Sequence, residues 1–369
     1  MNERTTDALI AQAARAARQF DLGAQVLGAR TLGRGLINDT FLINTDSSVR
    51  PRAVLQRINR RVFPEPGPLM ENLRILLAHA PAPRHGAGLG FPELIRARDG
   101  ADFYTDPEDS VWRMLGYVER SRTLYAVENL RQAEAVGAAL GEFHALACGL
   151  PMERMRITRP GFHNTPLYYQ RFELAAVSTC PAPGTDLEHC LHFARARAAD
   201  VHALEQARAS GNIPLRVVHG DPKLDNFLFD ETSDHVVSLV DLDTVQPGLV
   251  HYDVGDCLRS CANPAGECPA DPAEARFDLD IAGAILEAYL HRTRAFLTAG
   301  ELRLLPAAIR LIPFELGLRF LTDHLQGDVY FKIAWPGQNL HKARTQFRLV
   351  ADIERQETAI RGLVETLAN

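Results

Sequence analysis

The sequence predicts an α+β protein of two lobes, a small β-rich N-lobe followed by a larger, mainly helical C-lobe. Strand-like segments are concentrated before residue 116, and helical periodicity dominates from about residue 120 onward. The 369 residues are enough for two substantial hydrophobic cores. We therefore expect the N-lobe at residues 1–115, a hinge at 116–120 and the C-lobe at 121–369.

The composition excludes several classes of protein. A net charge of −6 argues against nucleic acid as the main partner, because phosphate backbones are bound by basic surfaces. No apolar run approaches the roughly 20 residues of a membrane span. Residues 1–20 are amphipathic and lack a long apolar region, so we expect a leading helix and not a secretory signal. The six cysteines form no Cys-x-x-Cys pair, which favours reduced thiols in a cytoplasmic protein. From the charge and the lack of a long apolar run we expect neither nucleic acid nor membrane as a partner. The sequence leaves the oligomeric state open.

The first elements of the N-lobe are two strands joined by a glycine-bearing turn. The strands are expected at residues 25–32 and 40–44. The turn holds Gly33 and Gly35, and such a turn can cover an anion with backbone N–H groups. Asn38 and Thr40 could add side-chain donors. The alternative is a plain hairpin turn.

The next strand is expected at residues 53–58, followed by a helix at 69–78. Successive strand residues face opposite sides, so only one of Gln56 and Arg57 can face the cleft between the lobes. We favour Arg57 for its charge, the alternative being an exposed surface arginine. Glu71 could pair with that cation, or it could be a solvated helix residue.

The rest of the N-lobe leads to the hinge, and the C-lobe follows as helices. Strand signals return at residues 94–95 and 111–115, and Tyr117 lies in the hinge. A helical stripe at residues 133–144 ends in His144, which we expect to be a core histidine. Further helices are expected at residues 187–208 and within 276–326. Pro306 and Pro313 are expected to break or start helices there.

The most informative stretch of the chain is residues 218–241. Asp221 follows a glycine on a tight turn, Asn226 lies five positions further on, and Asp241 ends an apolar strand. Phosphoryl transfer from Mg-ATP to a hydroxyl needs these groups: a carboxylate that accepts the substrate proton, and an amide oxygen and a second carboxylate that hold Mg²⁺. Lys223 could neutralise phosphate charge, and Asp243 could assist the metal ligands.

These residues resemble the aminoglycoside phosphotransferase and choline kinase superfamily, which has the protein-kinase-like two-lobed fold. Narrower motifs resemble its N-acetylhexosamine 1-kinase branch. They are Gly35 to Phe41, Leu55 to Asn59, Met70 to Asn72, Gly161 to Thr165, Val240 to Gly248, Tyr252 to Asp256 and Arg319 to Phe331. The resemblance covers roughly residues 30 to 350.

The resemblance implies roles for individual residues. Asp221 and Lys223 would be catalytic, and Asn226, Asp241 and Asp243 would hold the metal. Backbone groups of the hinge would grip adenine, so Tyr117 is as easily a core residue as a nucleotide contact. The nucleotide-binding set would be Gly33, Gly35, Asn38, Thr40, Arg57, Glu71 and Tyr117. Protein kinases have a lysine where this chain has Gln56-Arg57, which is a departure from the pattern.

The substrate would be bound by helical insertions of the second lobe. The candidate residues are Arg319, Tyr330, His163 and Asn164. Arginine donors suit sugar oxygens or an N-acetyl carbonyl, although Arg319 could instead form an i,i+4 ion pair with Asp323. Asp253 and Asp256 are expected to brace the catalytic loop.

The sequence therefore predicts an ATP- and Mg²⁺-dependent kinase that phosphorylates the anomeric 1-hydroxyl of an N-acetylhexosamine or a related sugar. One alternative is a kinase of another small alcohol, such as a choline-like amino alcohol or an aminoglycoside. Another is a pseudokinase that binds nucleotide without turnover. The pattern leaves open the sugar epimer and the need for the N-acetyl group, since small-group differences are often worth only ~1–3 kcal/mol.

Overall fold

The N-terminal part of the chain forms one antiparallel sheet in the computed structural model, which describes residues 3–33, 37–80, 88–177, 179–180, 182 and 184–368. The strand order is β1-β2-β3-β6-β4, with β5 paired to β6. The strands are β1 (Val26–Thr31), β2 (Asp39–Thr45), β3 (Arg52–Ile58), β4 (Leu94–Ile95), β5 (Tyr104–Thr105) and β6 (Val111–Gly116). The predicted strands of the N-lobe are confirmed.

The two faces of this sheet have different neighbours. One face contributes Phe41, Leu55 and Trp112 to a core that also contains alanines of α1 (Glu3–Ala17). On the other face, Ile58 packs into the core that includes the buried side of α2 (Pro66–His79). The alternation of strand side chains thus assigns odd positions of β3 to the α1 side and even positions to the cleft side.

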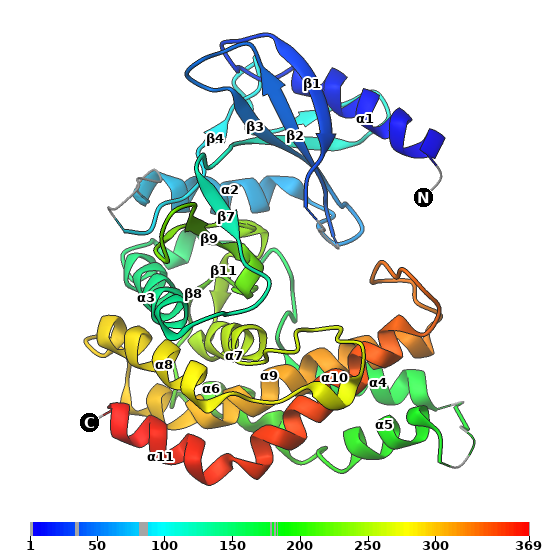
Figure 1. The fold of residues 1–369 in the computed structure, drawn as a ribbon, viewed down its shortest axis with the longest axis vertical. Helices are drawn as coiled ribbons and strands as arrows, with labels where there is room; N and C mark the ends of the chain where they lie inside the picture. The colour runs from blue at the N-terminus through cyan, green and yellow to red at the C-terminus, as the bar shows by residue number, and fades with distance from the viewer. Residues whose placement is uncertain are drawn as a thin grey trace.

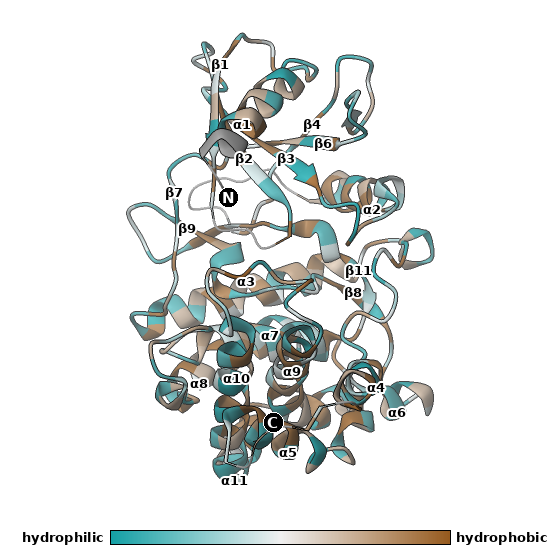
Figure 2. Cartoon of the chain, turned by 90° about the vertical axis from the view of Figure 1, so that its right-hand side faces the viewer, coloured by the Kyte–Doolittle hydropathy of each residue, from teal (hydrophilic) through white to brown (hydrophobic). Residues whose placement is uncertain are grey.

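The C-terminal part is helical, as predicted (Figure 1). Its helices are α3 (Leu130–Ala147), α4 (Thr165–Ala176), α5 (Asp186–Arg195), α6 (Ala203–Ala209), α7 (Val250–Cys261), α8 (Leu279–Thr293), α9 (Ala299–Leu325), α10 (Gln338–Arg355) and α11 (Glu357–Ala368). Figure 2 shows the same arrangement from the side, with both hydrophilic and hydrophobic positions along the helices, as amphipathic packing requires. No helix among the described residues is both long and apolar enough to cross a bilayer.

Two helix predictions differ from the structure. Pro306 and Pro313 lie inside the continuous 27-residue helix α9 and do not break it. Each proline removes one backbone hydrogen bond, but α9 packs against α4, α7 and α10, and this burial offsets the loss. The single helix expected at residues 187–208 is divided into α5, a short 3-10 turn (Asp200–His202) and α6.

Five short strands lie between the sheet and the helices (Figure 1). β7 (Ser121–Thr123), β9 (Phe227–Asp230) and β10 (Val236–Leu239) form one small sheet, and β8 (Arg216–Val218) pairs with β11 (Gln246–Gly248). The loops that leave β8 and β10 carry Asp221 and Asp241. The short strands therefore set the positions of the candidate catalytic residues.

Candidate active site

A pocket between the sheet and the helices brings half of the candidate residues together. Asp221, Lys223 and Asp241 line it from the catalytic loops, Gln56 from β3 and Arg319 from α9. Its other lining residues are Ile37, Asn38, Thr40, Phe63, Arg159, Phe162, His163, Asp243, Thr244, Asp256, Arg259, Glu267, Leu316, Phe320 and Phe331. Segments from both parts of the chain thus meet at one site.

The backbone before Asp221 follows a path that requires glycine. Gly220 has a φ of +86°, and a Cβ at this position would lie 2.9 Å from both the Cβ and the carbonyl oxygen of Thr244. Any side chain there would have to displace the loop that follows β10. The loop carrying Asp221 and the loop carrying Asp243 and Thr244 can therefore approach this closely.

A buried carboxylate on α7 holds the same turn. Asp253 accepts hydrogen bonds from the backbone N–H groups of His219 and Gly220, both at 2.7 Å. His144 on α3 contacts Asp253 through Nε2 at 2.9 Å, and its Nδ1 lies 2.9 Å from the hydroxyl of Tyr289. Burial acts to raise the pKa of Asp253, but the hydrogen bond and charge of His144 outweigh it and lower the pKa. The predictions for Asp253 as a brace and His144 as a core residue are confirmed.

Asp221 lies in a short network of its own loop. Lys223 Nζ donates to Asp221 Oδ2 at 2.9 Å, and Asn226 Nδ2 donates to the Asp221 carbonyl at 2.7 Å. Burial would raise the pKa of Asp221, but the ammonium of Lys223 holds the pKa below its usual range. Asp221 is thus an ionised carboxylate with about a third of its side chain exposed.

Asn226 and Asp241 form a donor set that fits Mg²⁺. Because Nδ2 of Asn226 is used by Asp221, its amide oxygen remains for a cation. Burial, followed by the charge of Asp243, raises the pKa of Asp241 to about 7 and outweighs the opposing charges of Lys223 and Arg113. Among the described residues no group of three or more His, Cys, Asp or Glu side chains could hold a metal. Mg²⁺ often takes only one or two protein ligands and completes its shell with phosphates and water.

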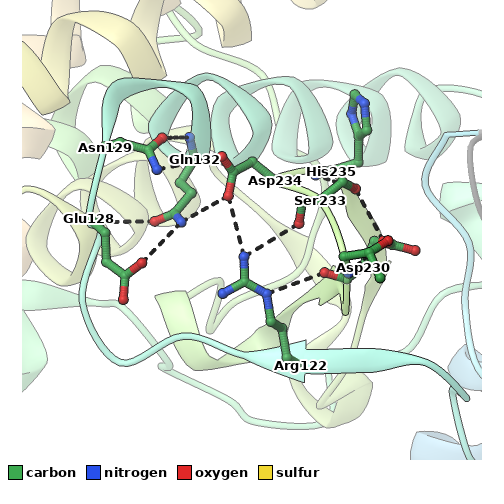
Figure 3. A network of polar contacts seen from close by, with 9 residues as sticks. Arg122, Glu128, Asn129, Gln132, Asp230, Ser233, Asp234 and His235 are labelled. Carbon is green, nitrogen blue, oxygen red and sulfur yellow. Dashed lines mark hydrogen bonds and ion pairs between the residues drawn. The ribbon is translucent and has the colours of Figure 1, made fainter.

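The turn between β9 and β10 is hydrogen-bonded to α3 (Figure 3). These contacts hold the loop that carries Asn226 and the loop that carries Asp241 relative to each other. Gln132 Nε2 donates to Asp234 Oδ1 at 2.9 Å, and Arg122 of β7 donates to the same oxygen at 3.3 Å. Arg122 also reaches the carbonyl of Asp230 at 3.3 Å. The polar turn at residues 230–234 is thereby a structural anchor of the hairpin that begins after Asn226 and ends before Asp241.

Asp243 is held by two residues of the sheet region. Its Oδ1 forms an ion pair with Arg113, and its Oδ2 accepts a hydrogen bond from Asn38 at 2.6 Å. Asn38 also accepts the backbone N–H of Asn59 through Oδ1, so its amide is used on both sides. Both residues also line the pocket, so the roles expected for Asp243 at the metal and for Asn38 at phosphate stay predictions. In addition, Asp243 connects the helical part to the sheet.

The structure also corrects the interpretation of β3. Gln56 lines the pocket, whereas Arg57 lies on the opposite face and pairs with Asp39 at 2.7 Å. Because α1 covers that face, Arg57 cannot be the cation of the cleft. Glu71 pairs with Arg156 at 3.2 Å, so its expected pairing with Arg57 is also wrong.

The remaining nucleotide candidates are distributed over different surfaces. Thr40 lines the pocket and its Oγ1 accepts a hydrogen bond from Gln56 at 3.3 Å. Gly33 has a φ of +73° and lies in an adjoining hollow between the sheet and Lys332. Gly35 lies outside the described residues. Tyr117 is not brought to the pocket, since its ring lies under the guanidinium of Arg52 at 4.3 Å.

Arg319 lies among aromatic rings at the substrate side of the pocket. Its guanidinium carbon is 5.4 Å from the ring centroids of Phe162 and Tyr168 and 5.5 Å from that of Phe331. The carboxylate of Asp323 does not pair with it but accepts the backbone N–H groups of residues 329, 330 and 331 at 2.8–2.9 Å. Within the described ranges no carboxylate forms an ion pair with Arg319, so its donors are available to a ligand.

Tyr330 is brought near the pocket by the segment that Asp323 anchors. Its hydroxyl accepts a hydrogen bond from Arg159 at 2.8 Å, and Arg159 itself lines the pocket. The guanidinium of Arg159 lies 4.0 Å from the ring centroid of Phe162. Arg159 was not identified from the sequence, where it lies in an irregular segment without a motif.

His163 and Asn164 are not placed as substrate ligands, because both ring nitrogens of His163 have partners and Asn164 does not line the pocket. His163 is buried, with Nδ1 3.0 Å from Glu315 and Nε2 2.7 Å from the carbonyl oxygen of Gly220. Asn164 caps α4 by accepting the backbone N–H of Leu167 at 2.9 Å. Both expectations are corrected: His163 supports the catalytic loop and Asn164 starts a helix. The signal that was missed is Glu315, a carboxylate in the apolar middle of α9.

Asp256 also differs from its expected bracing role. One of its oxygens accepts a hydrogen bond from Arg259 at 2.8 Å. The other, Oδ2, is buried without a hydrogen-bond partner in the described part of the chain, and the residue lines the pocket. Asp256 therefore faces the ligand space and does not hold the backbone of the catalytic loop.

Several solved structures have a fold similar to that of this chain. The microcompartment-associated aminopropanol kinase matches with a TM-score of 0.63 at 18% identity, covering 95% of this chain and 98% of that one. A choline kinase from Cryptosporidium parvum Iowa II matches with a TM-score of 0.62 at 13% identity, covering 99% and 100%. The amicoumacin kinase hAmiN, solved with AMP-PNP, Ca²⁺ and Ami, has a TM-score of 0.59 at 16% identity, covering 96% of both chains. These likenesses show a kinase-like fold.

A match to a family model identifies the family of this chain in addition to its fold. The model of the phosphotransferase enzyme family (APH) matches residues 28–296, which is more than half of the chain and includes Asp221, Asn226 and Asp241. The chain therefore belongs to the phosphotransferase enzyme family.

Proposed function

We propose that this phosphotransferase uses Mg-ATP to phosphorylate the anomeric 1-hydroxyl of an N-acetylhexosamine or a closely related sugar. The observation that carries the proposal is the position of Arg319 in the same pocket as Asp221. Its guanidinium is surrounded by aromatic rings and has no ion-pair partner among the described carboxylates. Such a group can donate to neutral acceptors, for example ring hydroxyls or an acyl carbonyl.

The chemistry follows from the residues of the two loops. The sugar hydroxyl gives its proton to the ionised carboxylate of Asp221 while the oxygen attacks the γ-phosphorus and ADP leaves. Lys223, hydrogen-bonded to Asp221, keeps that carboxylate charged and oriented. Asn226 and Asp241 would hold Mg²⁺, which supplies neutralisation of phosphate charge when it is bound. Asp253 holds the backbone of the loop in place during these changes of charge.

A kinase of a cationic amino alcohol or an aminoglycoside is the second candidate. The observation in its favour is Asp256, whose Oδ2 lies buried without a hydrogen-bond partner in the described part of the pocket. Structural neighbours named as aminopropanol and choline kinases have the same fold. Against it, a cation would have to enter an aromatic-lined site that Arg319 already occupies with positive charge, at a repulsive cost.

The decisive experiment is an assay of ADP release from Mg-ATP with a panel of acceptors. The panel contains N-acetylglucosamine, N-acetylgalactosamine, their non-acetylated parents, choline and an aminoglycoside. The two N-acetylated sugars are also tested as 1-O-methyl glycosides, and Asp221→Asn serves as the inactive control. We expect turnover on an N-acetylhexosamine that disappears with the 1-O-methyl form. Turnover on choline or the aminoglycoside alone would reject the sugar assignment, and nucleotide binding without turnover on any acceptor would favour a pseudokinase.

A further inference from the structure

A buried arginine on β6 occupies the cleft side of the sheet. Arg113 is 1% exposed and lies directly across from Gln56 in the register of β3 and β6. Its Nε and Nη2 donate to Oε1 of Gln56 at 2.9 and 2.6 Å. Arg113 also forms an ion pair with Asp243, whose side chain is 4% exposed. A guanidinium is rarely buried in this way unless its charge is compensated.

Protein kinases have a lysine–glutamate pair at the place where this chain has Arg113, Gln56 and Asp243. In those enzymes a lysine on the third strand contacts the α- and β-phosphates and pairs with a glutamate of the following helix, within one lobe. Here the strand position on the cleft side is Gln56, which is neutral. The candidate glutamate of α2, Glu71, is paired with Arg156. Neither member of the usual pair is therefore present on this face.

The pair that replaces it crosses between the two parts of the molecule. Asp243 follows Asp241 by two residues in the loop after β10, and Arg113 belongs to the large sheet. Asn38, in the segment before β2, donates to the other oxygen of Asp243 at 2.6 Å. One carboxylate is thus held by two residues of the sheet region, and the loop carrying Asp241 is held with it.

We propose that Arg113 takes the place of the strand lysine as a positioning residue, holding Gln56 and Asp243 so that the sheet and the Asp241 loop together form the phosphate side of the nucleotide site. The inference rests on the proposed use of ATP but not on the identity of the acceptor. Nη1 of Arg113 is buried without a hydrogen-bond partner in the described residues, so the guanidinium has a donor not used by Gln56 or Asp243. The pair also explains why this chain needs no lysine on β3.

The test compares nucleotide affinities, measured by titration calorimetry with Mg²⁺ and a non-hydrolysable ATP analogue. Arg113→Met is expected to weaken binding at least about tenfold, as loss of a charge-assisted interaction does. Arg57→Met, which removes the arginine on the opposite face of the sheet, is expected to change it less than about twofold. The double variant Gln56→Lys/Arg113→Met restores a cation at the strand position and is expected to recover most of the affinity. Wild-type affinity in Arg113→Met, or no recovery in the folded double variant, would overturn the proposal.

A second comparison applies if Arg113→Met does not fold, as judged by thermal unfolding. Arg113→Gln and Arg113→Lys both keep donors towards Gln56 but differ in charge. We expect the lysine variant to bind the analogue at least about fivefold more tightly than the glutamine variant. Equal affinities would show that the charge is not used and would overturn the inference. If the wild-type protein binds no nucleotide at all, the proposed function fails first, which separates the two outcomes.

Discussion

The carboxylate of Asp253 accepts a hydrogen bond from the backbone N–H of Gly220 at 2.7 Å, one residue before Asp221. Its other oxygen accepts the N–H of His219 at the same distance. A charged side chain on α7 therefore fixes the path of the catalytic loop, while Thr244 contacts the loop from the other side through its hydrogen bond to the His219 carbonyl at 2.8 Å.

Replacing Asp253 by Asn should loosen this turn. The amide can accept only one of the two N–H groups and places an NH₂ group against the other, which leaves buried groups unsatisfied at a cost of about 2–4 kcal/mol. We expect a lower midpoint of chemical unfolding and a reduced kcat with little change in KM for the acceptor. Asp278→Asn, at the half-buried N-cap of α8, is the control for a substitution outside the site. Unchanged stability in Asp253→Asn would contradict the bracing role.

Replacing Asp221 by Asn should separate binding from turnover. The variant keeps the shape of the loop but loses the group that accepts the substrate proton, so kcat should fall by about 10²–10⁴. Nucleotide affinity should stay within about threefold, because Asn226 and Asp241 remain. Calorimetry and the ADP-release assay measure the two quantities. A turnover close to that of the wild-type protein would rule out Asp221 as the proton acceptor.

Replacing Asn226 by Ala should change the requirement for Mg²⁺. Loss of one oxygen ligand should raise the Mg²⁺ concentration for half-maximal activity by about tenfold or more. The variant also loses the hydrogen bond to the Asp221 carbonyl, so a moderate decrease in kcat at saturating Mg²⁺ is expected as well. Asn212→Ala, at an exposed position, is the matched control. An unaltered Mg²⁺ dependence in Asn226→Ala would show that Asn226 is not a ligand of the metal.

Replacing Arg319 by Met should affect the acceptor and not the nucleotide. If its guanidinium donates to a neutral sugar, removal should raise the acceptor KM by about 10–100-fold, corresponding to ~1.4–2.8 kcal/mol. The KM for ATP should be unchanged. Arg171→Met is the control, since Arg171 also lies over the Tyr168 ring, at 5.5 Å, but does not line the pocket. Improved activity on a cationic acceptor in Arg319→Met would favour the amino alcohol alternative.

Replacing Glu315 by Gln should make stability depend differently on pH. Burial acts to lower the pKa of His163, but the carboxylate of Glu315 outweighs it and raises the pKa. A raised pKa in the folded state means that protonated His163 stabilises the fold. This stabilisation is complete below the unfolded pKa of about 6.5 and is lost as pH rises through the folded pKa. The wild-type protein should therefore exceed Glu315→Gln in unfolding free energy by a larger margin at pH 6 than well above neutrality. A margin that does not decrease with rising pH would show that His163 is neutral.

The sequence by itself determined the features that depend on local order. The spacing of Asp221, Asn226 and Asp241 predicted a catalytic loop and a metal site because these residues are joined by one short hairpin. The alternation of the N-terminal strands predicted the β-rich N-lobe, and the helical stripe ending in His144 predicted the helical C-lobe. These patterns are periodic, and a period can be read from neighbouring residues alone.

Only the tertiary structure decided which polar groups meet. The alternation of β3 separates Gln56 from Arg57, but the position of α1 selects the face that is covered. His163 and Glu315 are 152 positions apart, and Asn38 and Asp243 are 205 apart. The partners of a buried charge are set by the packing of whole elements, which no local pattern encodes. For the same reason Pro306 and Pro313 lie within α9, since the helices packed against it stabilise a helix that the local sequence disfavours.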